Sequence, residues 1–182
     1  MRIDIDSFET YTSLARDGAR SAAESLSRLT GIDTHVEVTN VSLVAPDELK
    51  NEFLGGEFAG VKIALDGALD GETVLTFDEA ARVAITDVLA PEADERMRRS
   101  SIEEVGNILT SGFIDGWAEH LDAIIDISPP TYVEGTGASV LPTGTTEGHE
   151  QVFVFRSRVE SPTEAIDFHI LLIPERESLV GA

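Results

Sequence analysis

The stretch SSIEEVGNILTSGFIDGWAEHLDAIIDISPP, from Ser100 to Pro130, predicts a long helix followed by a strand that two prolines interrupt. With about 100° of rotation per residue, its apolar side chains gather along one side of the helix. The opposite side is polar, and Glu104 and Asn107 are neighbours near its centre. The predicted apolar stripe consists of Ile102, Val105, Leu109, Gly112, Phe113 and Gly116, with Trp117 at its edge.

The length and composition of the chain indicate one folded domain. Its 182 residues suffice for a sizeable core, and 42% of them are hydrophobic. No apolar run reaches the roughly 18 residues that a membrane span needs. The N-terminal segment Met1–Asp17 lacks the charged-then-apolar layout of a signal peptide. Because there is no cysteine, we expect a cytoplasmic protein without disulfides or thiolate metal sites.

The net charge of the chain is strongly negative. Acidic residues number 34 against 13 basic ones, and the formal net charge is -21. Such a surface repels nucleic acid and anionic lipid, so neither is an expected partner. Its self-repulsion weakens in about 1 M salt, where the Debye length is about 3 Å. The composition therefore indicates a halophilic, archaeal-like host and says little about the substrate.

The periodicity of the whole chain predicts an α+β fold. The expected elements occur in the order helix, strands, short helix, and then helix and strands again. We expect helices at about 7–30, 78–89 and 91–121, and strands at 35–44, within 53–69, and at 72–77, 124–127, 139–141, 151–159 and 165–173.

The two halves of the chain resemble each other when the sequence is shifted by 91 residues. Leu14 then falls on Val105, Ala22 on Phe113 and Leu26 on Trp117. Helical periodicity alone can also produce such a match. The duplication predicts one domain, 1–182, with repeats at about 7–90 and 91–174, a turn at 144–150 and a tail at 175–182. It also predicts two pseudo-symmetric repeats that form an antiparallel sheet with two long helices packed on one face.

The polar face of the second long helix has two readings. It can be an ordinary solvated face, in which Ser101-x-x-Glu104 forms a capping box. However, Pro91 and the acidic residues after it predict that the helix begins before Ser101, which would leave Glu104 without a free amide to cap. Asn107 is also a poor residue inside a helix. In the second reading a partner covers this face, and Ile114, which falls on it, contacts that partner.

The spacing Ser100-x-x-x-Glu104-x-x-Asn107, followed after 22 residues by Pro130, resembles the signature of the CheC/FliY/CheX family of chemotaxis phosphatases. The runs EEVGNILTSG and SAAESLSRLTG are also similar to helices of that family, and the resemblance extends over roughly 8–174. It implies hydrolysis of the aspartyl phosphate on the response regulator CheY. Glu104 and Asn107 would be the catalytic residues, and Ser100 and Pro130 would complete the motif.

The resemblance also implies how these residues act. A carboxamide both donates and accepts hydrogen bonds, so Asn107 would orient the attacking water. Glu104 would anchor a cationic side chain of the regulator. The regulator would supply its own Mg²⁺, so no cofactor or metal site is expected in this chain.

The first half lacks the motif. At the shifted positions Ser13 replaces the glutamate, Arg16 the asparagine and Thr39 the proline. An arginine cannot accept a hydrogen bond, so we predict that the first site is inactive. Two other functions stay open. One is a non-catalytic adaptor that binds CheD, phosphorylated CheY or both, and the other is a component associated with the flagellar switch.

Overall fold

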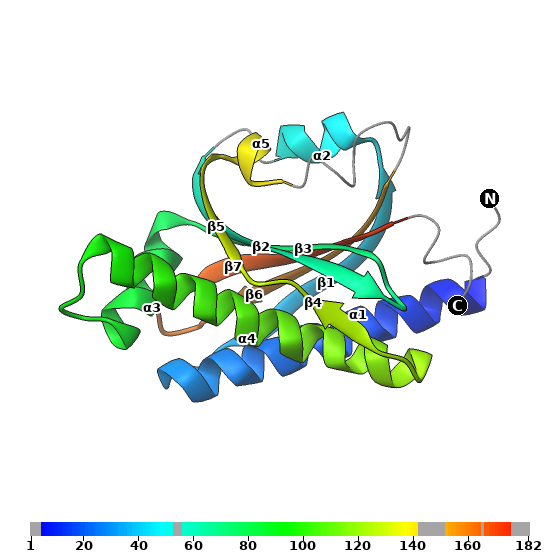
Figure 1. The fold of residues 1–182 in the computed structure, drawn as a ribbon, viewed down its shortest axis with the longest axis horizontal. Coiled ribbons are helices and arrows are strands. Elements are labelled where there is room, and N and C mark those ends of the chain that lie inside the picture. The colour runs from blue at the N-terminus through cyan, green and yellow to red at the C-terminus, as the bar shows by residue number, and fades with distance from the viewer. Residues whose placement is uncertain (1–4, 53–55, 142–151, 165, 176–182) are drawn as a thin grey trace.

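The computed structural model describes residues 5–52, 56–141, 152–164 and 166–175 (Figure 1). Two helices, α1 and α4, are much longer than the others, and a strand follows each of them directly. The elements are α1 (Ile5–Thr30), β1 (His35–Val44), α2 (Pro46–Glu52), β2 (Glu57–Gly67), β3 (Gly71–Phe77), α3 (Glu79–Leu89), α4 (Glu95–Leu121), β4 (Ile125–Ile127), β5 (Thr131–Thr136), α5 (Gly137–Val140), β6 (Val152–Glu160) and β7 (Asp167–Pro174).

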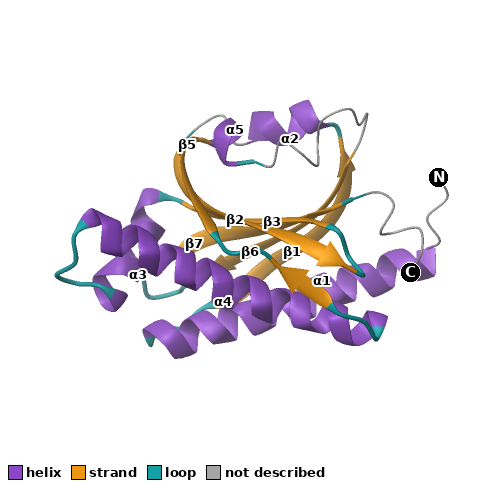
Figure 2. Cartoon of the chain, viewed as in Figure 1, coloured by secondary structure: helices purple, strands orange, loops and turns teal. Residues whose placement is uncertain are grey.

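The strands form one antiparallel sheet in the order β1-β6-β7-β3-β2-β4, and β5 also pairs with β2. The long helices α1 and α4 lie side by side on one face, and the short helices α2 and α5 lie across the other (Figures 1 and 2). A large core fills the space between the long helices and the sheet. The predicted α+β architecture, with two long helices on one face, is confirmed.

Two glycines let α4 lie close to its neighbours. A Cβ atom on Gly18 of α1 would be 2.5 Å from the backbone oxygen of Phe113. A Cβ atom on Gly106 would overlap the side chain of Val61 on β2, with 2.7 Å to its Cβ. Any larger residue at either position would push α4 away from α1 or from the sheet. The position of the polar face of α4 is therefore fixed by close backbone packing.

The sheet has the symmetry expected of two repeats. Each half runs helix, strand, short helix and two further strands, where β4 and β5 together correspond to β1. If each strand is exchanged with its counterpart, β2 with β6 and β3 with β7, the strand order is the same read from the opposite edge of the sheet. The pseudo-twofold axis passes between β3 and β7, which pair with each other in an antiparallel manner.

Both halves carry an extra residue at matching places in the edge strand. In β1 the register shifts by one residue between Val36 and Val38. In the second half, Ile127 pairs with Leu65 but Thr131 pairs with Lys62, so four steps on one strand match three on the other. The prolines 129 and 130 lie in this interval, where no ladder hydrogen bond needs their nitrogen. They separate β4 from β5.

Several predicted boundaries are wrong. The helix expected from residue 91 begins at Glu95, because Asp94 caps it by accepting a hydrogen bond from the Met97 amide at 2.9 Å. No strand forms at 139–141, because residues 139 and 140 belong to the end of α5. The elements α2 and β5 were not predicted. The predicted turn at 144–150 and most of the predicted tail lie outside the described residues. None of the described helices has a segment long and apolar enough to cross a lipid bilayer.

Candidate functional site

Glu104 and Asn107 lie on the outer side of α4, as the periodicity predicts. Glu104 is exposed and Asn107 is half-buried. Because α4 begins at Glu95, Glu104 lies well inside the helix and has no free amide to cap. The hydroxyl of Ser101 donates to the backbone oxygen of Met97 at 3.0 Å, so it does not act as a cap either. The capping-box reading is therefore wrong.

The buried side of α4 largely follows the prediction. Ile102, Val105, Leu109, Phe113 and Trp117 are all buried, whereas Gly112 and Gly116 are only half-buried. The expectation that Ile114 lies on the outer face is wrong, since only 3% of it is exposed. The chain returns along the C-terminal half of α4 as β4, and this covers the side of the helix on which Ile114 lies.

A regular set of contacts joins α4 to β5. Arg99 forms an ion pair with Glu134 at 2.6 Å, and Glu103 accepts a hydrogen bond from the Tyr132 amide at 3.2 Å. Four residues of helix advance about 6 Å and two residues of strand about 6.6 Å, so the two elements keep in step as they run in opposite directions. A further step of four residues along α4 leads from Glu103 to Asn107, and a step of two residues along the strand leads from Tyr132 back to Pro130.

This spacing predicts that Asn107 and Pro130 lie near the same level of the helix and strand. They are separated by 22 residues in the sequence, and the chain that follows α4 runs back along it as β4 and β5. Pro130 is half-buried, like Asn107. Glu104 projects to the other side of the helix ridge, away from β5. The two motif residues of α4 thus differ in exposure, with Glu104 exposed and Asn107 half-buried.

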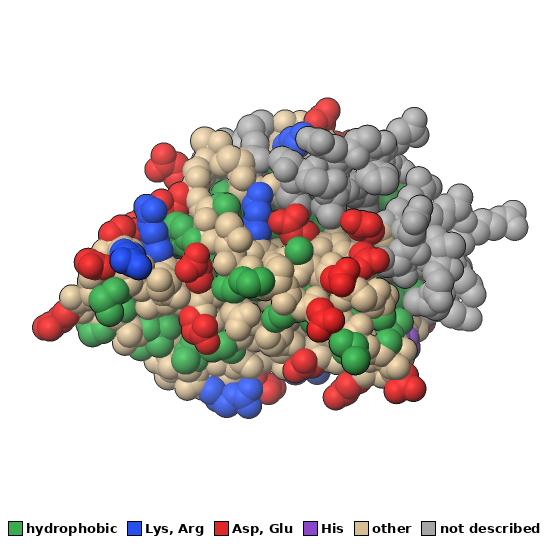
Figure 3. All heavy atoms as spheres, viewed as in Figure 1, with side chains coloured by type: hydrophobic (Ala, Val, Ile, Leu, Met, Phe, Trp, Pro, Cys, Tyr) green, Lys and Arg blue, Asp and Glu red, His purple; other side chains and the backbone are tan. Residues whose placement is uncertain are grey.

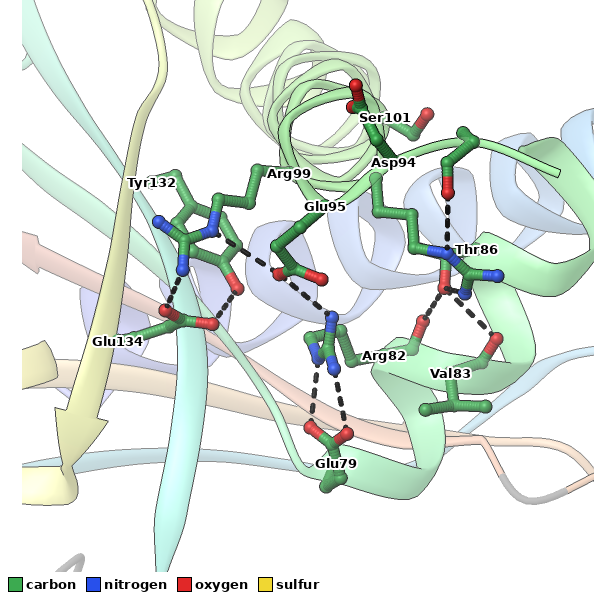
Figure 4. A network of polar contacts seen from close by, with 12 residues as sticks. Glu79, Arg82, Val83, Thr86, Asp94, Glu95, Arg99, Ser101, Tyr132 and Glu134 are labelled. Carbon is green, nitrogen blue, oxygen red and sulfur yellow. Dashed lines mark hydrogen bonds and ion pairs between the residues drawn. The ribbon is translucent and has the colours of Figure 1, made fainter. Parts of the chain in front are cut away.

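A polar network holds the first turns of α4 in place (Figure 4). Glu95 bridges Arg99 at 3.3 Å and Arg82 of α3 at 3.6 Å. The guanidinium of Arg99 lies 5.3 Å from the ring centre of Tyr132, whose hydroxyl donates to Glu134 at 2.7 Å. Burial raises the pKa of Tyr132, and its hydrogen bond to the Glu134 carboxylate raises it further, so Tyr132 stays a donor. The network fixes Ser100 next to two hollows.

Ser100 lies on the ridge between the two hollows. The first has a volume of about 590 Å³ and a largely charged lining of Glu95, Arg96, Arg99, Glu103 and Tyr132. The second has a volume of about 380 Å³ and includes Glu104 on its rim; the rest of its lining is Leu29, Leu89, Met97, Ser101 and Val105. A partner that approaches Glu104 and Asn107 from outside must therefore cover one or both hollows.

The corresponding residues of the first half also lie on its surface. Ser13 and Arg16 are exposed on α1, and Thr39 on β1 contacts the Ser157 hydroxyl at 3.2 Å. Arg16 and Thr39 line one hollow, together with Arg20. This pairing matches the pairing of Asn107 with Pro130 in the second half. Within the described residues, no group of three or more His, Asp or Glu side chains is placed to hold a metal ion.

Sequence reasoning missed Glu103. Its neighbour Glu104 fits the motif, whereas Glu103 makes the contact to the strand. A signal was present, because Glu103 and Asn107 are four residues apart and so share one face of the helix. That signal needed the position of β5, which the sequence pattern did not provide.

Comparisons with known proteins show which family this chain resembles. The model of the CheC-like family matches residues 97–134, which span the motif from α4 to β5. The Halobacterium salinarum protein named "Putative CheY-P phosphatase CheC1" is 35% identical over 186 residues, which cover 98% of this chain and 95% of that protein.

Two solved structures share the fold. FliY from Thermotoga maritima has a TM-score of 0.78 at 20% identity, and the match covers 100% of this chain and 96% of FliY. CheX from Borrelia burgdorferi, solved in complex with CheY, BeF3 and Mg²⁺, has a TM-score of 0.59 at 16% identity. That match covers 96% of this chain and 100% of the other. At these identities the likeness concerns the fold alone.

Proposed function

The chain belongs to the CheC-like family, and from this we propose that it hydrolyses the aspartyl phosphate of a CheY-type response regulator in the cytoplasm. The reaction would end the signal from the regulator to the motor. The observation that carries the proposal is that Glu104 and Asn107 lie together on the outer face of α4, the helix that a hydrogen bond from Tyr132 to Glu103 joins to β5. The name of the 35% identical relative supports it.

Asn107 performs the positioning step in this proposal. Its carboxamide oxygen accepts a hydrogen bond from water, and its nitrogen donates one to a phosphoryl oxygen. The water oxygen then attacks phosphorus in line with the aspartyl oxygen. The P–O bond to the aspartate breaks, which leaves a free carboxylate and inorganic phosphate, and the phosphate retains both protons of the water. Positioning of this kind is the main requirement of a loose transition state.

Glu104 serves as an anchor. It is exposed, and among the described residues it has no ion-pair partner within the chain. A carboxylate in this state is available for a cationic side chain of the regulator, with which it forms a charge-assisted hydrogen bond. The Mg²⁺ that neutralises the phosphoryl charge comes from the regulator. Ser100 has a small side chain that leaves room for the regulator on the outer face of α4, and Pro130 shapes the strand beside Asn107.

The decay of a phosphorylated CheY tests the proposal. The regulator is phosphorylated, and loss of the phosphoryl group is followed in about 1 M KCl with and without this protein. We expect faster decay with the wild type and no acceleration with Asn107→Ala. If the wild type binds the phosphorylated regulator without speeding its decay, the phosphatase proposal is wrong.

A non-catalytic adaptor is the second candidate. It is favoured by the first half, which keeps the repeat fold although its motif positions hold Ser13, Arg16 and Thr39. Such an adaptor would bind CheD, phosphorylated CheY or both. The likeness to FliY, at 20% identity, concerns the fold and does not favour a component associated with the flagellar switch over these two candidates.

A further inference from the structure

Three apolar side chains meet beside Glu104. Leu29 comes from the end of α1, Leu89 from the end of α3 and Met97 from the first turn of α4. Leu29 is 39% exposed and Met97 is 60% exposed. Figure 3 shows apolar side chains gathered toward this end of the molecule. Glu104 lies on the rim of the hollow that they line.

Exposed apolar side chains are scarce on the described surface of this acidic protein. The large hydrophobic residues exposed there are Leu29, Leu43, Val83, Val88, Met97 and Ile124. Single exposed residues of this kind are normal and need no explanation. Leu29 and Met97, however, line one hollow together with Leu89, and this hollow borders the proposed catalytic residues.

The hollow is not a by-product of the repeat. The 91-residue shift sets His120 on Leu29 and Asp6 on Met97, so the first half has no matching apolar pair. The described hollow that Arg16 and Thr39 line corresponds to the Asn107–Pro130 region, and its lining is rich in charged residues. By sequence, the apolar pair Leu29 and Met97 therefore accompanies the half in which the motif is intact.

We propose that this hollow receives an apolar side chain of the phosphorylated regulator, next to a cationic side chain that pairs with Glu104. The proposal rests on the proposed function and names the surface that recognises its substrate. Because Ser100 and Glu104 belong to both the motif and the hollow, a regulator that brings its phosphoryl group to Asn107 covers the hollow at the same time.

The ionic conditions give a physical reason for apolar docking. In about 1 M salt the Debye length is about 3 Å, so ion pairs at an exposed interface contribute little. Burial of apolar surface is not screened by salt. In a salt-rich cytoplasm, the apolar hollow would therefore give this protein, with its net charge of -21, a stable contact with its partner. The ion pair of Glu104 would orient that partner.

The variant Met97→Glu tests this proposal, and Ile124→Glu is its matched control. Both introduce a carboxylate in place of an exposed apolar side chain, and Ile124 is 77% exposed at the opposite end of α4. Binding is titrated with Halobacterium salinarum CheY activated by beryllofluoride and Mg²⁺, and turnover is measured with the phosphorylated regulator. We expect Met97→Glu to raise Kd and KM about tenfold and to keep kcat within about twofold.

The outcomes separate the two proposals. If Ile124→Glu behaves like the wild type and Met97→Glu binds weakly, the docking surface is supported. If Met97→Glu binds like the wild type, the docking inference is wrong and the phosphatase proposal stands. A wild-type dimer that Met97→Glu dissociates, measured by light scattering, would overturn the inference in favour of a second copy in the hollow. If the wild type does not speed decay at all, the proposed function itself fails.

Discussion

The backbone amide of Tyr132 donates a 3.2 Å hydrogen bond to Glu103 Oε1, and this bond joins the motif helix to the strand that follows Pro130. Glu103 is one turn before Asn107 on the same side of α4, and Tyr132 is two residues after Pro130. We therefore expect this bond to help set the position of Pro130 relative to Asn107. Glu103 acts as a positioning residue, since it contacts neither of the reacting groups proposed above.

Glu103→Ala should lower both the turnover rate and the free energy of unfolding. It leaves the Tyr132 amide without its partner, which costs about 1–3 kcal/mol, and it lets β5 shift relative to Asn107. We expect kcat to fall about tenfold or more. Glu103→Gln keeps an acceptor oxygen and should restore kcat. If both variants lose only thermal stability, and kcat well below Tm equals that of the wild type, Glu103 has a purely structural role.

Asn107→Ala should remove most of the activity and leave binding intact. Loss of one group that positions the transition state commonly costs about a hundredfold in rate, or about 2.7 kcal/mol. Glu104→Ala should weaken binding of the activated regulator as well. The measurements are single-turnover decay and titration with beryllofluoride-activated CheY. Near wild-type turnover of Asn107→Ala would refute the mechanism, and an unchanged affinity of Glu104→Ala would refute its anchoring role.

Gly106→Ala should destabilise the fold, although alanine is the better helix former. The new methyl group would overlap the Val61 side chain and push α4 away from β2, at a cost of about 1–3 kcal/mol. Gly116→Ala on the same helix is the matched control, because a Cβ atom there meets nothing within 4 Å. That change should stabilise by up to about 1 kcal/mol. Equal effects of both substitutions on denaturant unfolding would contradict the close packing of α4 on the sheet.

Stability should increase with salt. The acidic side chains that give the formal net charge of -21 repel one another. This repulsion is screened as KCl rises from about 0.1 M to about 1 M, because the Debye length falls from about 10 Å to about 3 Å. Thermal unfolding across this range should therefore show a rising Tm. A midpoint that stays constant or falls would remove the halophilic interpretation and would leave the phosphatase proposal untouched.

Helical periodicity predicted the parts of the fold that depend on local pattern. The large apolar side chains of the stripe from Ile102 to Trp117 are buried, and Asp78, the first residue of the helix expected at 78–89, caps that helix by accepting a hydrogen bond from the Ala81 amide at 2.7 Å. Strand β1 has the bounds that its alternation indicates. The same pattern placed Ile114 on the outside. It is buried because β4 returns along the helix, and no pattern within the helix contains that information.

The parts that were missed depend on contacts between distant segments. Strand β5 contains Glu134 and Gly135 and has little apolar alternation, since it lies at the edge of the sheet beyond β2. Without β5, the sequence could not show that Glu103 reaches Tyr132 or that Pro130 lies level with Asn107. The motif residues were recognisable from their spacing. Their arrangement on two sides of the α4 ridge follows from the tertiary fold.

The double variant Ser13→Ala with Arg16→Ala tests whether the protein has a single site. Both residues are exposed on α1, so the stability change should stay within about 0.5 kcal/mol. Arg16 and Thr39 line a hollow that corresponds to the Asn107–Pro130 region, but an arginine side chain cannot accept a hydrogen bond from a water molecule. We therefore expect the decay of phosphorylated CheY to proceed at the wild-type rate, while circular dichroism confirms the fold. If the folded double variant loses turnover, the first half contributes chemistry or docking, and the assignment of the site to Glu104 and Asn107 alone is wrong.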